Sequence, residues 1–200
     1  MKKIVLFAIA ILALSVLWSG CRQDKQATQW SRERINQWYS NQDWLVGMNY
    51  IPRTAINPIE MWQEETFDPK IIDQELGWAE ELGFTSIRVY LNHLVWQKDS
   101  SAYIQRLDHF LDIADRHGIS TMFVFFDAVW QPHSSTGPQP EPVPHVHNSG
   151  WVQCPDQKTL KDTAGYDNLK HYVQHIGRTF SDDKRVVIWD MYNEPGNHNG

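Results

Sequence analysis

The segment I-W-D-M-Y-N-E-P (188–195) runs from apolar residues into an amide, a carboxylate and a proline. A glutamate side chain can release and take back a proton, so Glu194 is a candidate for acid–base chemistry. Pro195 cannot donate a hydrogen bond to a neighbouring strand, and it biases Glu194 away from helical backbone. The pattern therefore indicates a strand that ends here and leaves Asn193 and Glu194 at its rim.

Polar side chains also stand at or near the ends of three earlier apolar runs, which cover residues 44–50, 84–91 and 119–126. These polar residues are Asn49, Arg88, Asn92 and Asp127. In a parallel barrel, the C-terminal strand ends meet on one face, and the active site is built there. We therefore expect these side chains to lie near Asn193 and Glu194.

Three helical patterns separate the four runs. Asp68 and Pro69 have the types preferred at a helix start, and the apolar stripe that follows ends before Gly83. Residues 101–117 repeat the pattern and are followed by Gly118, a second left-handed stop. A third stripe runs from Leu169 to Phe180. The alternation of strand and helix predicts an α/β fold with a parallel sheet and helical crossovers.

Two architectures fit this alternation: a doubly wound open sheet, and the first half of an eight-stranded barrel. The strands read as continuous apolar runs, which predicts that both faces of the sheet are covered. The first strand reaches V-G-M-N (46–49) without a G-x-G-x-x-G fingerprint, so dinucleotide binding has no support.

Three features together resemble clan A of the glycoside hydrolases, most closely family 5 with its cellulases, 1,4-β-xylanases and mannanases. They are N-E-P on the fourth strand (193–195), Arg88 within S-I-R-V-Y on the second, and G-M-N (47–49) on the first. Members are (β/α)8 TIM barrels that cleave β-glycosidic bonds with retention of configuration. The resemblance implies that this chain carries the first four βα units of such a barrel, over residues 44–200.

The resemblance also assigns roles. Glu194 corresponds to the general acid/base, Asn193 to the residue that binds the sugar 2-hydroxyl, and Arg88 to the arginine beside the nucleophile. That nucleophile is a second carboxylate, roughly 5–5.5 Å from the acid in retaining enzymes. In this clan it is a glutamate on the seventh strand. We therefore expect it beyond Gly200, and we expect these residues alone to be inactive and poorly folded, with two open sheet edges.

A long insertion follows the third strand and should overhang the face that carries the strand ends. Trp130 and Trp151 are candidates for stacking on sugar rings, and His147 and Asn148 for contacts with sugar hydroxyls. Packing of the two tryptophans beneath the loop is an equal alternative. Asn49 and Asn92 complete the predicted substrate-binding set. Family 5 members often carry a histidine near the end of the third strand, whereas this sequence has Asp127 in F-F-D.

A metal site formed by His145, His147 and Cys154 is a weaker reading, because two histidines two positions apart lack a clear fourth ligand. We therefore predict no metal and no cofactor.

Residues 1–20 have the order of a bacterial signal peptide: Lys2 and Lys3, then an apolar run that ends at Trp18. Ser19-Gly20-Cys21 resembles a lipobox, which implies cleavage before Cys21 and lipidation of that residue. We therefore expect a lipoprotein anchored in the cell envelope, at the outer membrane or cell surface, or a secreted protein if Cys21 is not lipidated. Residues 21–43 then form a tether and an N-terminal helix.

Charge excludes some partners. Cleavage would remove two lysines and no acidic residue, and the net charge would change from −6 to −8. Such an acidic protein is a poor candidate for binding nucleic acid. Two functions remain open: a glycosidase that acts on a polysaccharide such as xylan, cellulose or mannan, and an envelope protein that binds glycans without cleaving them.

Overall fold

The computed structural model describes residues 29–197, so the signal peptide and Cys21 lie outside the described residues. The chain divides into two compact units, with the boundary between Asp43 and Trp44. The first unit contains helix α2 (Arg32–Ser40), whose N-cap Ser31 accepts a hydrogen bond from the backbone of Arg34. None of the described helices is both long and apolar enough to cross a membrane.

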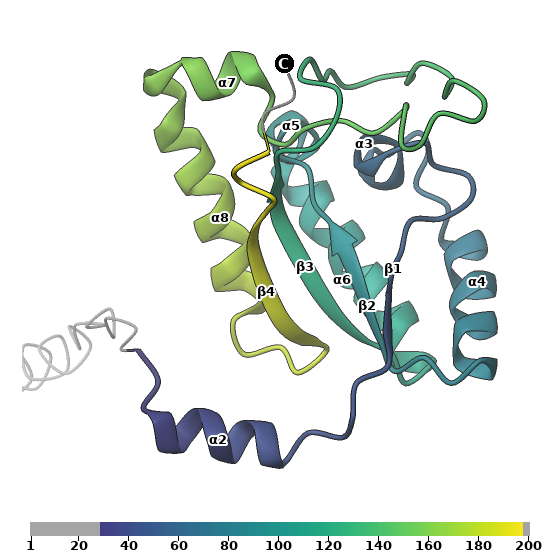
Figure 1. Ribbon diagram of the computed structural model, residues 1–200, viewed down its shortest axis with the longest axis vertical. Coiled ribbons are helices and arrows are strands. Elements are labelled where there is room, and N and C mark those ends of the chain that lie inside the picture. Colours follow the sequence, from purple (N-terminus) through teal and green to yellow (C-terminus); the bar gives the residue numbers. More distant parts are fainter. Residues whose placement is uncertain (1–28, 198–200) are drawn as a thin grey trace, which may run out of the picture. The chain divides into compact units, whose positions relative to one another are not determined.

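The second unit is built on a parallel sheet of four strands (Figure 1). They are β1 (Gly47–Asn49), β2 (Ser86–Tyr90), β3 (Ser120–Asp127) and β4 (Val186–Asn193). Their order in space is their order in sequence, and each pairs in parallel with the next. A doubly wound sheet reverses its strand order at a switch point, and this sheet has no reversal. The predicted fold class is therefore confirmed as four strands of a partial (β/α) barrel.

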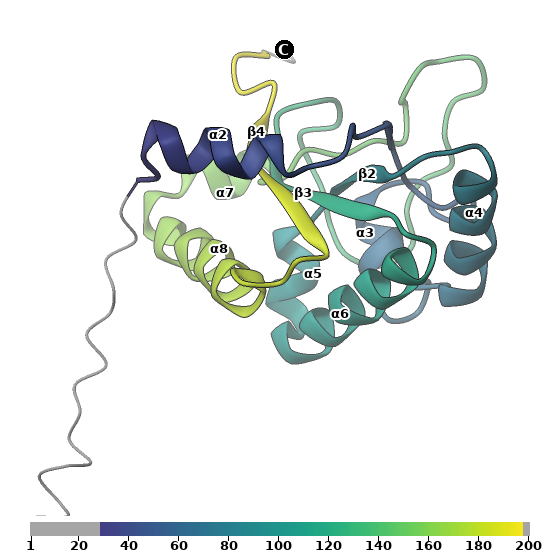
Figure 2. The same ribbon diagram turned by 90° about the horizontal axis from the view of Figure 1, so that it is seen from below.

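The helices α4 (Pro69–Glu81), α6 (Ser100–Arg116) and α8 (Tyr166–Phe180) lie on one face of the sheet (Figure 2). Asp68 caps α4 as predicted, because its carboxylate accepts hydrogen bonds from the backbone of Lys70 and Ile71. Gly83 and Gly118 follow α4 and α6 with φ of +86° and +66°, the left-handed conformation that favours glycine. Fully buried side chains fill the space between helices and sheet: Ile72, Leu76, Ile87, Val89, Leu107, Phe110, Phe123, Tyr172 and Ile176.

The prediction that both faces of the sheet are covered is wrong for the described residues. The face opposite the helices carries an open groove of about 440 Å³, lined by Met48, Arg88, Met122 and Ile188 among others. Exposure in β2 accordingly alternates along the strand, with Ile87 and Val89 buried against the helices and Arg88 partly exposed.

Short elements escaped the sequence analysis: α3 (Pro58–Trp62), α5 (His93–Lys98), α7 (Gln157–Lys161) and the 3₁₀ turn η1 (Thr163–Gly165). Six residues or fewer are too short for a periodic apolar stripe. Each of the three α-helices begins instead at a side-chain cap, supplied by Asn57, Asn92 and Asp156 respectively.

The insertion between β3 and α7 runs across the end of the sheet at which the strands finish (Figure 1). It folds back on the strand it leaves, because Asp127 pairs with Cys154 and Gln131 pairs with Val152 in isolated bridges. It is also tied to α3: the buried Asn57 amide donates to the carbonyl of Gly150 at 3.0 Å. The insertion is therefore held at both its root and its far side.

Cys154, near the end of this insertion, lies against the side chain of His93. Its sulfur is 3.4 Å from His93 Nδ1, and both side chains are buried. Burial raises the pKa of the Cys154 thiol to about 12, so it stays protonated. The described residues contain no group of three or more His, Cys, Asp or Glu side chains that could hold a metal ion.

His93 makes stability depend on pH. Burial lowers the pKa of its imidazole to about 4, and the nearby Asp156 only partly opposes this. An unfolded histidine titrates near pH ~6.5, so the unfolded chain binds the extra proton between these values and the free energy of unfolding falls as pH falls through the window. His93→Gln cannot be protonated and should remove a decline on the order of 3 kcal/mol.

Urea unfolding at pH values above and below this window measures the effect. His171→Gln, at an exposed position of α8, is the matched control and should keep the wild-type decline. Equal declines in wild type and His93→Gln would contradict the assignment.

Candidate active site

A cleft of about 530 Å³ opens at the C-terminal ends of the strands. The strand ends contribute Asn49, Arg88, Tyr90, Asp127, Asn193 and Glu194 to its lining, and the insertion contributes Trp130, His147, Asn148 and Trp151. Every site residue predicted within the barrel segment therefore lines this cleft, except Asn92. Residues from all four strands and one loop meet here because parallel strands end on the same side of the sheet.

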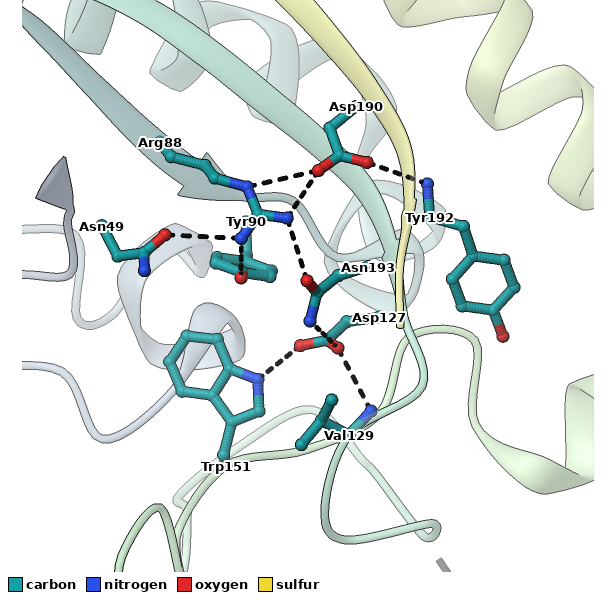
Figure 3. Close-up of polar contacts among 9 residues, drawn as sticks. All are labelled: Asn49, Arg88, Tyr90, Asp127, Val129, Trp151, Asp190, Tyr192 and Asn193. Atoms are coloured by element: carbon teal, nitrogen blue, oxygen red, sulfur yellow. Dashed lines mark hydrogen bonds and ion pairs between the residues drawn. The ribbon is translucent and has the colours of Figure 1, made fainter. Parts of the chain in front are cut away.

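Arg88 lies at the centre of the polar contacts (Figure 3). Its Nε donates to Asp190 Oδ2 at 3.2 Å, and its Nη2 donates to Asp190 as well and to Asn193 Oδ1 at 3.0 Å. Its Nη1 donates to the Tyr90 hydroxyl and, at 3.4 Å, to Asn49 Oδ1. The planar guanidinium fork thus bonds side chains of β1, β2 and β4 at once, a geometry that a lysine ammonium does not offer.

A second set of bonds converges on Asp127 at the end of β3 (Figure 3). Its Oδ1 accepts from Asn193 Nδ2 at 2.9 Å and from the backbone of Val129 at 3.1 Å. Its Oδ2 accepts from the indole of Trp151 at 2.6 Å. Asn193 therefore links the two sets, because one end of its amide faces Arg88 and the other faces Asp127.

Burial shifts the pKa values of two groups that line the cleft, Asp127 and Tyr90. Asp127 is only 4% exposed, and burial raises the pKa of its carboxyl, while the hydrogen bonds from Asn193 and Trp151 act in the opposite direction. Burial also raises the pKa of the Tyr90 phenol, so its hydroxyl stays protonated. Because that oxygen accepts from Arg88, its own proton is free to donate to a ligand in the cleft.

Glu194 stands at the rim as an exposed carboxylate. Its Oε2 accepts from Asn197 Nδ2 at 2.9 Å, and its carbonyl accepts from the backbone of Asn197. Its φ is +48°, so the chain turns sharply after β4. This turn leaves the carboxylate at the mouth of the cleft, beside the asparagine that the network below holds in place.

Asn92 requires a correction. Its side chain is fully buried, and its Oδ1 accepts from the backbone of Leu94 as the N-cap of α5. We predicted contact with substrate from its place near a strand end, but β2 ends at Tyr90 and Asn92 is already the N-cap of α5. Tyr90, the last residue of β2, lines the cleft, whereas Asn92 does not.

Backbone strain concentrates at the cleft. Within residues 29–197, four non-glycine residues have positive φ: Trp130, His145, Asn148 and Glu194. Trp130, Asn148 and Glu194 line the cleft. Strained conformations cost free energy and persist where the surrounding structure over-determines them, and they cluster at functional sites.

The two tryptophans differ in their surroundings. Trp151 is anchored by Asp127 and its ring meets the edge of Tyr90, with centroids 5.1 Å apart. Trp130 contacts His147 edge-on at 5.8 Å. Trp151 therefore both packs the loop down and lines the cleft, and its stacking on a sugar ring stays a prediction.

Three residues of the network had no assigned role in the sequence analysis: Tyr90, Asp127 and Asp190. The sequence analysis placed Asp127 near Asn193 by its position at a strand end but gave it no partner. Asp190 stands on the fourth strand near the same end, which is the signal that could have given it a role. Tyr90 lies two positions after Arg88 and therefore on the same face of β2, since side chains alternate along a strand.

Comparison with known proteins agrees with this fold. No family model matches the sequence, and no curated protein matches it. Among solved structures, GH5_18 from Streptomyces cattleya in complex with GlcNAc has a TM-score of 0.50 and 16% identity over 78% of this chain and 36% of that one. The chain shares the fold of part of this structure, in agreement with a partial (β/α) barrel.

Two further structures align less well. A variant of the same Streptomyces cattleya enzyme, in complex with Manb1-4GlcNAc, has a TM-score of 0.44 and 17% identity over 70% of this chain and 33% of that one. The endo-1,4-beta-mannanase from Rhizomucor miehei has a TM-score of 0.45 and 18% identity over 70% and 43%. The chain thus spans less than half the length of each of these proteins. Sequence identities this low indicate a shared fold and nothing more.

The strain at Trp130 is measurable with two variants. Its φ is +73°, which costs a residue with a side chain roughly 1–2 kcal/mol. Trp130→Ala removes the ring and keeps the strain, whereas Trp130→Gly removes both. We expect Trp130→Gly to be more stable than Trp130→Ala by about 1 kcal/mol in urea unfolding, the reverse of the usual order of these residues. An alanine variant as stable as the glycine variant would contradict the left-handed assignment.

Proposed function

We propose that these residues form the acid/base half of a retaining glycoside hydrolase that cleaves β-glycosidic bonds in a polysaccharide such as a β-1,4-glycan. The observation that carries the proposal is the cleft itself. A rim carboxylate, a fixed asparagine and an arginine from strand ends lie in one cleft with two tryptophans, on part of a glycoside hydrolase barrel fold. Aromatic faces bind sugar rings, and amides and hydroxyls bind their hydroxyl groups.

In the proposed reaction, Glu194 donates a proton to the glycosidic oxygen as the bond to the leaving group breaks. Its position at the open mouth of the cleft suits this role, because the scissile oxygen must reach it. Asn193 donates a hydrogen bond to a sugar hydroxyl, and this bond strengthens as positive charge develops on the ring. Glu194 then acts as base and activates the water that releases the sugar.

The nucleophile of the proposal is a carboxylate outside the four strands of this chain. The other two acidic side chains of the network are already engaged: Asp190 with Arg88, and Asp127 with Asn193 and Trp151. The same observation favours the second candidate, a glycan-binding protein without hydrolytic activity. The two candidates differ in whether the full-length protein hydrolyses the glycans that it binds.

Glu194→Gln tests the first candidate. We expect this isosteric change to lower hydrolysis of unactivated β-1,4-glycans by about 10²–10⁴-fold in the full-length protein, because the proton donor is lost. Binding of the same glycans, measured by calorimetry, should persist. Glu81→Gln, at an exposed position of α4, is the control and should keep full activity.

Undiminished hydrolysis by Glu194→Gln would show that another group is the acid. Binding by the wild-type protein without hydrolysis would favour the second candidate, and the absence of both would reject the two together.

We extend the proposal to location: a lipidated Cys21 anchors the protein in the cell envelope, where a polysaccharide substrate would be met. Fractionation of cells that express wild type and Cys21→Ala tests this. The wild type should be recovered with membranes and the variant in the soluble fraction. Equal distribution of the two proteins would reject the anchor.

A further inference from the structure

Asp127 is a buried carboxylate that takes no part in the proposed reaction. It accepts hydrogen bonds from three groups: Asn193 Nδ2 at 2.9 Å, Trp151 Nε1 at 2.6 Å and the Val129 backbone at 3.1 Å. These groups belong to the end of β4, the far part of the insertion and the residues just after β3. Loss of these donors would leave a buried carboxylate without hydrogen-bond partners, which costs free energy of folding. The three bonds therefore tie the three segments together.

The Asn193 amide is held in one orientation by its two neighbours. An asparagine amide can rotate by half a turn, which exchanges its oxygen and its nitrogen with little change in shape. Arg88 Nη2 can only donate, and it bonds the amide oxygen at 3.0 Å. An ionised Asp127 can only accept, and it bonds the amide nitrogen. The reversed amide would place donor against donor at Arg88 and acceptor against acceptor at Asp127.

The fixed orientation decides what Asn193 offers to a ligand. An amide nitrogen carries two hydrogens, and the bond to Asp127 uses one of them. The second hydrogen remains on this nitrogen, and Asn193 lines the cleft together with Glu194. A sugar hydroxyl that approaches this point would therefore meet a donor and would bind through its oxygen.

We propose that Asp127 is a positioning residue, whose carboxylate fixes the Asn193 amide as a donor to a sugar hydroxyl and at the same time holds Trp151 in the cleft wall. This inference rests on the proposed function, because it takes the ligand of the cleft to be a glycan. Asp127 does not itself touch the reacting atoms; it acts through Asn193 and Trp151.

A double-mutant cycle tests whether Asp127 acts through Asn193. Asp127→Leu keeps a side chain branched at Cγ with the same number of heavy atoms and removes both acceptor oxygens, and Asn193→Ala removes the amide. Affinities for cellotetraose, xylotetraose and mannotetraose are measured in the full-length protein that carries Glu194→Gln, so that no glycan is cleaved. We expect each single change to weaken binding of the recognised glycan by about tenfold, and the double change to add less than about twofold to the larger loss.

Trp151→Phe separates the two bonds, because it keeps an aromatic ring and removes only the indole donor. In the presence of Asn193→Ala, it should still weaken binding by its full single-variant factor. Additive losses for Asp127→Leu and Asn193→Ala would overturn the inference. If Asp127→Leu does not fold, Asp127→Ala completes the same cycle, because it also removes both oxygens.

A measurement without any glycan keeps this inference separate from the proposed function. In ¹⁵N-labelled protein, the Asn193 side-chain amide and the Trp151 indole should each give a proton resonance shifted downfield by a hydrogen bond to a carboxylate. Asp127→Leu should move both resonances upfield, whereas Trp151→Phe should leave that of Asn193 in place. If no glycan binds, the proposed function fails, and this spectrum still decides whether Asp127 fixes the amide. Unmoved resonances would overturn the inference even in a protein that binds glycans.

Discussion

The guanidinium of Arg88 is the interaction on which the candidate site depends. A parallel sheet brings its strand ends to one edge, but backbone pairing alone does not fix the side chains that extend beyond that edge. Arg88 does this by donating to Asn49, Asp190 and Asn193, which belong to β1 and β4 on either side of its own strand. Its charge is partly buried, with 24% of the side chain exposed, and is compensated by Asp190. Breaking such a pair leaves an uncompensated charge, so the network holds together or fails as a unit.

Much of the fold could be predicted because its signals are local. Asp68 caps α4, and Gly83 and Gly118 end α4 and α6 through interactions within a few residues along the chain. Strand and helix alternation then fixes the order of elements, and short right-handed crossovers leave few topologies. The coverage of the sheet was harder to predict: apolar runs indicated two covered faces, but one face carries the open groove that Met48, Met122 and Ile188 line.

The site was predictable only in part, because its residues were found by their place at strand ends and not by their partners. Glu194 and Arg88 stand out in short motifs. Asp127 depends on Asn193 and Trp151, which are 66 and 24 residues away in sequence, and no local pattern encodes such contacts. Asn92 was predicted at the cleft from its place near a strand end, but it caps α5 and is buried there. An asparagine before a five- or six-residue helix carries too weak a pattern to distinguish these outcomes.

The bond from Asn57 to Gly150 has a consequence for how the cleft opens. It joins residues that are 93 positions apart in the sequence. β2, α6 and β3 lie between them, and the folding of these elements brings the two residues close together in space. The far side of the insertion, around Gly137, Gln139 and Gly150, therefore packs on strands and helices that are already formed. A few side-chain hydrogen bonds from α3 and its two cap residues hold it there, rather than sheet pairing. Segments of this kind exchange amide hydrogens through local opening, at a lower free energy than global unfolding. Local opening on the far side of the insertion would therefore leave the side-chain network at the strand ends intact.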